Sequence, residues 1–156
     1  MQHIYNKKNH KKNGAALVLV LVTFLVICIF TAIISSIIET NLMQAKSQEN
    51  SMKAYYLALS GSDLCFAALL QKGPSGDNDT LLYKRFNPTN VAPSPLTDTL
   101  TLDGGTVDIT VTSMPNDAYG ERWVEIKSIA KLDHSTTKKT VILQFQFSNP
   151  SIQKKS

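Results

Sequence analysis

Residues 11–39, KKNGAALVLVLVTFLVICIFTAIISSIIE, determine how the rest of the chain can fold. Two lysines and a glycine lead into residues 15–38, a run of 24 residues without a charge, a glycine or a proline, and Glu39 follows it. About 20 apolar residues in a helix cross the hydrocarbon core of a bilayer, and a slightly longer helix crosses it with some tilt. The run therefore predicts a membrane-spanning helix.

A cleaved secretory signal peptide fits this run poorly. The apolar core of such a peptide is about 7 to 15 residues long and ends at a small-x-small cleavage pattern. The apolar run here is longer, and residues 31–41, TAIISSIIETN, offer no convincing pattern of that kind.

The net charge of +4 resides in the residues before this run. Lys7, Lys8, Lys11 and Lys12 are four of the 16 Lys and Arg residues, so the remaining 12 balance the 12 Asp and Glu residues, none of which precedes Ala15. Positive residues beside a span mark its cytoplasmic side. We expect the N-terminus inside the cell, the C-terminus outside it, and a single-pass protein of the cytoplasmic membrane.

The predicted helix continues beyond the apolar run, from Ala15 to about Gln71. No glycine or proline lies between Gly14 and Gly61, and residues 72–76, KGPSG, provide a normal stop. Past Glu39 the apolar residues recur at spacings of three and four, which predicts a stripe on one side of the helix. The stripe consists of Leu42, Ala45, Met52, Tyr56, Leu59, Phe66 and Leu70.

An amphipathic half-helix needs a folded partner along one side, and the C-terminal part of the chain predicts one. Residues 73–96 hold four of the six prolines and predict a loop. Residues 97–148 then alternate with period two, which predicts about four antiparallel strands, with turns at Asp103-Gly104-Gly105 and at residues 134–137. The expected apolar face is formed by Val107, Ile109, Val111, Val124, Ile126, Ile129, Val141, Leu143, Phe145 and Phe147.

The sequence thus predicts an α+β fold in which a long N-terminal helix, membrane-spanning and then amphipathic, packs on a small antiparallel β-sheet. We expect a frayed tail after the sheet. The predicted organisation is a basic leader (1–14), a transmembrane half of the helix (15–38), an amphipathic half (39–72), a loop (73–96), a β-sheet cap (97–148) and a flexible tail (149–156).

A basic leader that ends in glycine, an apolar helix directly after it and a small β cap together resemble type IV pilins and pseudopilins. The resemblance is to PilX-type minor pilins and K-type pseudopilins of type II secretion in particular. Residues 13–21, NGAALVLVL, are similar to the RGAALVLVL-like helix start of those subunits. Residues 52–70, MKAYYLALSGSDLCFAALL, are similar to their AFYAAEAGLEAAL segment. The resemblance covers about residues 11–70, and beyond that only the architecture matches.

The resemblance implies that a prepilin peptidase cuts between Gly14 and Ala15 and methylates the new amine of Ala15. A glycine suits that position, because it lets a protease approach the backbone closely. The fifth residue after the cut is Leu19, where major pilins carry a glutamate that pairs with the amine of a neighbouring subunit. PilX-type and K-type subunits resemble this chain in lacking it.

These features imply a low-copy subunit at or near the tip of a type IV pilus-like filament, which helps to prime assembly. The implied partners are prepilin peptidase, other pilin or pseudopilin subunits bound through the N-terminal helix, the assembly platform, and lipid before assembly. After assembly the protein belongs to a periplasmic or cell-surface filament. Motility or adhesion pili, type II secretion and competence all remain open as the system it serves.

The alternative is a permanent single-pass membrane protein whose small extracytoplasmic β domain acts as a binding or assembly factor. An enzyme is a distant third interpretation, because His3, His10 and His134 are scattered. Asp77 and Asp79 resemble a calcium loop only faintly, since its final glutamate is missing. We expect no catalytic site, no cofactor and no metal.

Three further features bear on partners. A mildly basic stretch is formed by Lys127, Lys131, Lys138 and Lys139. The balanced charge after Ala15 argues against a strong attraction to nucleic acid, although a nucleic-acid partner is not excluded. Trp123 is expected to anchor the sheet on the helix, with an exposed adhesive patch near Tyr119 as the alternative. Cys28 and Cys65, about 55 Å apart on one helix, are expected to be unbridged apolar fillers, with intermolecular pairing or lipidation of Cys65 as the alternative.

Overall fold

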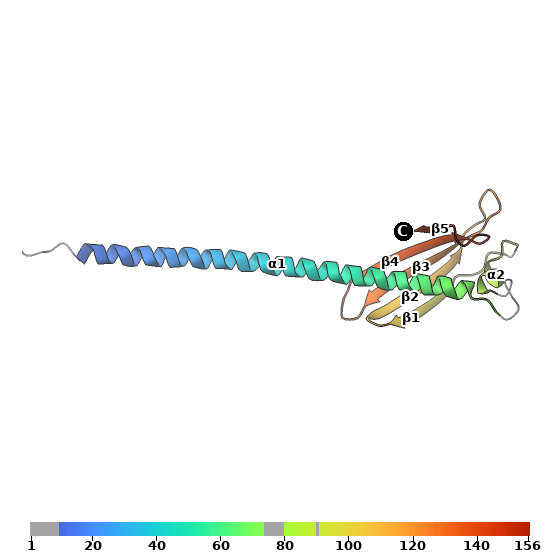
Figure 1. Cartoon of the computed structure of the whole chain (residues 1–156), viewed down its shortest axis with the longest axis horizontal. Helices are drawn as coiled ribbons and strands as arrows, with labels where there is room; N and C mark the ends of the chain where they lie inside the picture. The colour runs from blue at the N-terminus through green and yellow to red at the C-terminus, as the bar shows by residue number, and fades with distance from the viewer. Residues whose placement is uncertain (1–9, 74–79, 90) are drawn as a thin grey trace, which may run out of the picture. The chain divides into compact units, whose positions relative to one another are not determined.

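A computed structural model of the chain describes residues 10–73, 80–89 and 91–156, with side chains described from Ala15 onward. The chain comprises two compact units, residues 1–46 and 47–156. The predicted α+β fold is confirmed, since a long helix packs on an antiparallel sheet (Figure 1). The elements are α1 (His10–Leu70), α2 (Leu81–Phe86), β1 (Leu96–Leu102), β2 (Gly105–Ser113), β3 (Trp123–Leu132), β4 (Lys138–Gln146) and β5 (Gln153–Lys155).

Helix α1 begins at His10, five residues before its predicted start, and ends at Leu70, one residue before its predicted end. Gly14 lies inside the helix. A glycine costs an exposed helix about 1 kcal/mol relative to alanine but does not end it, and no proline occurs in this part of the chain. The leader and the apolar run are therefore continuous in backbone conformation from His10.

The sheet is a meander in the order β1-β2-β3-β4-β5, and every neighbouring pair is antiparallel. The predicted hairpin turn is present between β1 and β2, where Gly104 adopts a φ of +92° that suits a residue without a side chain. The second predicted turn is also present, and His134 in it has a φ of +57°. Both predicted strand pairs are therefore confirmed.

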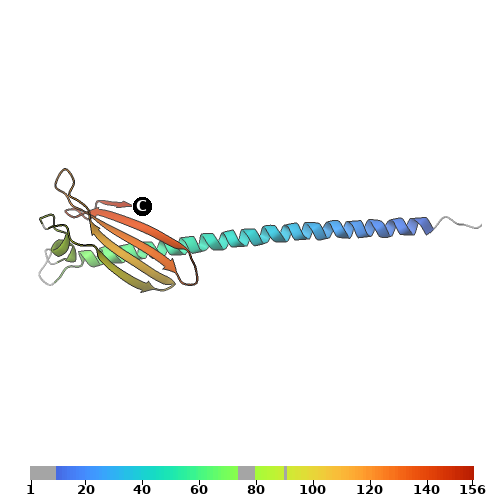
Figure 2. The same ribbon diagram turned by 180° about the vertical axis from the view of Figure 1, so that it is seen from behind.

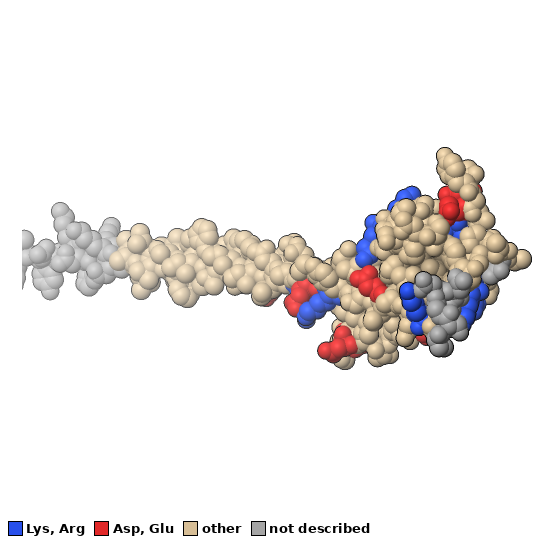
Figure 3. Space-filling model, turned by 45° about the vertical axis from the view of Figure 1, so that its right-hand side comes forward, with Lys and Arg blue, Asp and Glu red and all other residues tan. Residues whose placement is uncertain are grey.

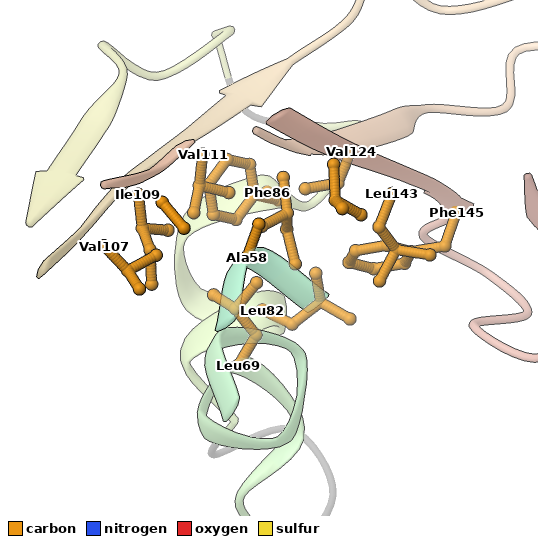
Figure 4. Close-up of a cluster of buried hydrophobic side chains, with 13 residues drawn as sticks. Ala58, Leu69, Leu82, Phe86, Val107, Ile109, Val111, Val124, Leu143 and Phe145 are labelled. Atoms are coloured by element: carbon orange, nitrogen blue, oxygen red, sulfur yellow. The ribbon is translucent and has the colours of Figure 1, made fainter. Parts of the chain in front are cut away.

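The last turns of α1 cover one face of the sheet. Figure 2 shows the opposite face, which α1 does not cover. The buried side chains between α1, α2 and the sheet form a single cluster (Figure 4). Its members are Ala58, Leu69, Leu82, Phe86, Val107, Ile109, Val111, Val124, Ile126, Ala130, Val141, Leu143 and Phe145. The predicted apolar face is thus confirmed except at Ile129, because β3 turns Ser128 and Ala130 inward instead. Phe147 is half-buried and packs against the cluster.

The predicted stripe on α1 is wrong in its most prominent members. Met52 and Tyr56 are 59% and 62% exposed. The face that meets the sheet is made of small residues, Ala54, Ala58, Gly61 and Ser62, all buried. The reason is the closeness of the contact: a Cβ atom placed on Gly61 would lie 2.6 Å from Cγ1 of Val107. Larger stripe members such as Leu59, Phe66 and Leu70 flank this contact and are half-buried.

Two segments predicted to be irregular contain regular structure. The loop 73–96 includes α2, whose N-cap Thr80 accepts a hydrogen bond from the Tyr83 N–H at 3.1 Å and whose Leu82 is buried. The tail includes β5, because β4 would otherwise present an open edge. Ile142 and Ser156 exchange both backbone hydrogen bonds, at 2.8 and 3.0 Å. The frayed tail was therefore an incorrect prediction.

Candidate membrane and processing segment

Residues 15–46 of α1 have no buried side chain, although residues 15–38 are almost entirely aliphatic or aromatic. Figure 3 shows one face of this helix, on which the surface of residues 15–38 is uncharged. The segment contains an 18-residue window of mean hydropathy 3.2, of which nothing is buried within the chain. The helix is long and apolar enough to cross a membrane, which confirms that part of the prediction by length and composition.

The two threonine hydroxyl groups in residues 15–38 are satisfied within the helix. Thr23 donates to the carbonyl of Leu19 at 2.8 Å, and Thr31 donates to the carbonyl of Ile27 at 2.9 Å. Bonds of this kind need no water, so these polar side chains do not oppose an apolar environment. The surface of residues 15–38 is suited to lipid or to other apolar helices, and it carries no ionised group.

The three residues singled out from the sequence lie close together on α1. Gly14 lies in its first turns, Ala15 is exposed, and the Leu19 side chain is 69% exposed. Lys7 and Lys8 of the basic leader lie outside the described residues. Peptidase cleavage between Gly14 and Ala15, and methylation of Ala15, stay predictions.

The structure describes only some of the residues considered for catalysis or metal binding, and His3 lies outside the described residues. Among the described residues no group of three or more His, Cys, Asp or Glu side chains is placed to hold a metal ion. His134 stands exposed in the β3–β4 turn. Asp77 and Asp79, the faint calcium loop, lie outside the described residues.

Trp123 does not anchor the sheet on the helix, so that prediction is wrong. Its neighbour Val124 points into the core, and alternation turns Trp123 to the outer face. There it is half-buried, with the Lys154 Nζ atom 4.7 Å from the ring centroid, a cation–π contact. The period of the strand was the signal that could have placed it. Tyr119, in the preceding loop, is 92% exposed.

The lysines of the mildly basic stretch are exposed. Lys127, Lys131 and Lys138 lie on the outer face of the sheet, where the β3–β4 register pairs Lys131 with Lys138. The same face carries Glu125, which accepts a hydrogen bond from Gln144 at 2.7 Å, and Asp108. Acidic side chains therefore interleave with the basic ones.

Both cysteines are free, as the sequence predicts. Cys28 is exposed on the apolar segment, and Cys65 is half-buried in the last turns of α1. Burial, and to a smaller extent the charge of Asp98, raise the pKa of the Cys65 thiol to about 11. The thiol is therefore protonated at neutral pH and behaves as a small apolar side chain.

Sequence reasoning missed a groove beneath β1. It has a volume of about 530 Å³ and is lined mainly by apolar side chains from α1, α2, β1 and β2, with Asp98 among them. The alternation of Leu96, Asp98 and Leu100 on one face of β1 was a detectable signal.

A scan against protein-family models and a search of curated proteins found no match to this chain.

Proposed function

We propose that the protein is a minor pilin or pseudopilin, a low-copy subunit at or near the tip of a type IV pilus-like filament that helps to prime assembly. The observation that carries the proposal is the character of residues 15–38: an uncharged helix, every side chain exposed, directly after a basic leader and Gly14. The helix continues without a break into a half that packs on a small sheet.

In this proposal the apolar segment serves two environments in turn. Lipid surrounds it before assembly, with the lysines holding the leader on the cytoplasmic side. Prepilin peptidase removes residues 1–14 and methylates Ala15, and the helix then packs against the helices of other subunits. Lipid tails are as apolar as leucine, so helix packing depends on van der Waals contact rather than on the hydrophobic effect. The exchange between the two environments therefore costs little.

Leu19 supports a low-copy position. A carboxylate inside a membrane or a helix bundle is costly unless it is paired. A leucine at this position avoids that cost but cannot pair with the amine of a neighbouring subunit. We propose that only one or a few copies of the subunit enter each filament, at positions that do not need the pairing between a glutamate and the amine of a neighbouring subunit. We propose further that its role is structural rather than catalytic.

The alternative is a permanent single-pass membrane protein with an extracytoplasmic binding or assembly domain, and the apolar helix of residues 15–38 is equally consistent with it. Processing separates the two functions. The full chain is expressed in its host with and without prepilin peptidase, and its N-terminus is identified by mass spectrometry. We expect loss of residues 1–14 and a methylated Ala15 only when the peptidase is present.

Gly14→Val is the test variant and Asn13→Ala the matched control. Gly14→Val should abolish processing, because a branched side chain stands beside the cut, whereas Asn13→Ala should be processed. A full-length chain under all conditions would favour the permanent membrane protein. Low-copy placement is tested separately, by quantitative proteomics of sheared filaments; equal abundance with the main subunit would contradict it.

A further inference from the structure

The groove beneath β1 exists because the helices do not cover the edge of the sheet. Leu64 and Ala68 of α1 and Leu81 of α2 line one side of it, and Leu96 and Leu100 of β1 line the other. Leu64 and Leu81 are exposed, and Leu96 and Leu100 are only half-buried. The groove is therefore an apolar surface that the described part of the chain leaves open to solvent.

Strand β1 lies at one end of the strand order and pairs only with β2 among the described strands. The free side of an edge strand presents N–H and C=O groups that can pair with another strand. The Thr99 N–H donates to Oδ1 of Asp98 at 2.8 Å. This bond places the Thr99 N–H on the free side, and in an antiparallel pair the N–H groups of Thr97 and Thr101 point the same way.

Asp98 is the residue that distinguishes this edge. Its register with Ile109 places it on the inner face, between Leu96 and Leu100, and it lines the groove. Its charge is felt at the Cys65 thiol across the groove, where it adds to the rise in pKa. An inward charge on an edge strand is one way proteins prevent indiscriminate pairing. Covering Asp98 with an apolar strand would bury a charged carboxylate without supplying an opposite charge, at a considerable cost.

We propose that the free edge of β1, with the groove beneath it, docks an extended segment of a different protein. The segment adds a strand to the sheet, inserts apolar side chains at alternate positions into the groove, and places a lysine or arginine against Asp98. Backbone pairing and alternate pockets are the usual basis of such strand addition. Asp98 makes the groove selective for a basic segment. It repels an acidic segment, and it lowers the affinity of a purely apolar segment, which would bury its charge.

A second copy of this chain does not fit the groove through either of its edge strands: its β1 would bring a second Asp98 carboxylate of like charge to the groove, and its β5 is short and polar. At the other end of the sheet, β5 is three residues long against seven in β1. Its inward residues, Gln153 and Lys155, are polar, and Lys155 already pairs with Asp63 at 3.1 Å. The proposed occupant of the groove is therefore a segment of a different protein. This inference does not depend on the proposed function.

The test uses the full chain in lipid nanodiscs, with empty nanodiscs as a blank, and labelled peptides as probes. The first peptide is Thr-Leu-Thr-Lys-Thr-Leu-Thr, and the second replaces its lysine by glutamate. We expect the lysine peptide to bind at least tenfold more tightly in fluorescence anisotropy, since close pairs of opposite charge at an interface favour binding and like charges oppose it. Asp98→Lys should reverse this preference. Asp103→Lys, the same charge change in the β1–β2 turn, should preserve it.

Backbone pairing is tested on the probe alone, so the result does not depend on how a variant folds. Two further lysine peptides carry N-methyl groups, one on its threonines and the other on its leucines and lysine. Strand addition uses one edge of the peptide, so one of these should lose binding and the other should keep it. Equal binding of both, equal binding of the lysine and glutamate peptides, or no binding at millimolar concentration would each overturn the proposal.

Discussion

Two parts of α1, residues 15–46 and 47–70, share a backbone conformation but differ in how their surfaces are used. The first part carries large aliphatic and aromatic side chains, all exposed. The second part buries a face of small residues, Ala54, Ala58, Gly61 and Ser62, together with Leu69. Apolar content alone therefore does not show where a helix packs within its own chain. Close approach to the sheet in the second part requires small side chains beside a few large ones such as Leu69 and Phe66, whereas the large side chains of the first part are all exposed.

The strongest test of this comparison exchanges a phenylalanine for alanine in each unit. Phe145 is 0% exposed and meets the Phe66 ring edge-to-face at 4.9 Å, whereas Phe30 is 61% exposed. Phe145→Ala should lower the free energy of unfolding of the cap by about 3–5 kcal/mol, the usual cost of such a core truncation. Phe30→Ala should change it by less than about 0.5 kcal/mol.

Unfolding of the full chain in detergent is followed by the fluorescence of Trp123, the single tryptophan, which lies in β3. A large loss of cap stability in Phe30→Ala would show that the apolar segment has a partner within its own chain. That result would contradict the division drawn between the two parts of α1.

The next test enlarges a small residue in each part. Gly61→Leu places atoms where Val107 Cγ1 and Ser128 Oγ already lie, at 2.6 and 3.0 Å from an added Cβ. Overpacking of this kind costs about 1–3 kcal/mol, which outweighs a gain in helix propensity of up to about 1 kcal/mol. Ala32→Leu, on the exposed segment, should leave unfolding of the cap unchanged.

Chemical denaturation measures both variants. If the contact with Val107 is the cause, Gly61→Leu combined with Val107→Ala should recover part of the loss. An unchanged denaturation midpoint in Gly61→Leu would mean that α1 does not approach the sheet this closely.

The sequence predicted the structure correctly where residue periodicity or the length of an apolar run directly indicates a secondary-structure element. Period-two alternation predicted the two hairpins, and the length and apolarity of residues 15–38 predicted a segment able to cross a membrane. The face of α1 on the sheet was missed, because searches for apolar periodicity favour Met52 and Tyr56 over Ala58 and Gly61. How closely a helix approaches a sheet depends on the side chains of the facing strands, and the sequence pattern of the helix alone does not contain this information.

The remaining differences also arise from tertiary context. Strand β5 has no apolar pattern and forms because the edge of β4 is available to it. The alternation of Leu96, Asp98 and Leu100 in β1 indicates an inward face, but whether that face is covered depends on where α1 and α2 lie, which the sequence of β1 alone does not reveal. Gly14, Ala15 and Leu19 are a different case: they were selected through a resemblance, and their roles are tested by processing rather than by the fold.

The smallest effect concerns the two cysteines and appears only at high pH. Burial and the charge of Asp98 raise the pKa of Cys65 from 9.0 to about 11. Below pH 9 the thiol is protonated in the folded and unfolded chain alike, so it contributes no pH dependence. Between pH 9 and 11 the unfolded chain loses this proton first, and the folded state therefore loses stability as the pH rises.

The measurement is the free energy of unfolding of the cap from pH 8 to 11. Because other groups titrate in the same range, each variant is compared with the original chain at every pH, and the difference between the two free energies is followed. Cys65→Ala should remove part of the decline above pH 9, and Cys28→Ala should leave it intact, because Cys28 lies on the part of α1 that packs on nothing in the described chain. Asp98→Asn should make the decline linked to Cys65 smaller and should end it at a lower pH, while its onset near pH 9 stays. The reason is that the thiolate then forms more readily in the folded state, so the gap between the folded and unfolded pKa values narrows. A decline identical in Cys65→Ala and Cys28→Ala would show that the thiol is not held in an apolar contact, and the second part of α1 would then resemble the first.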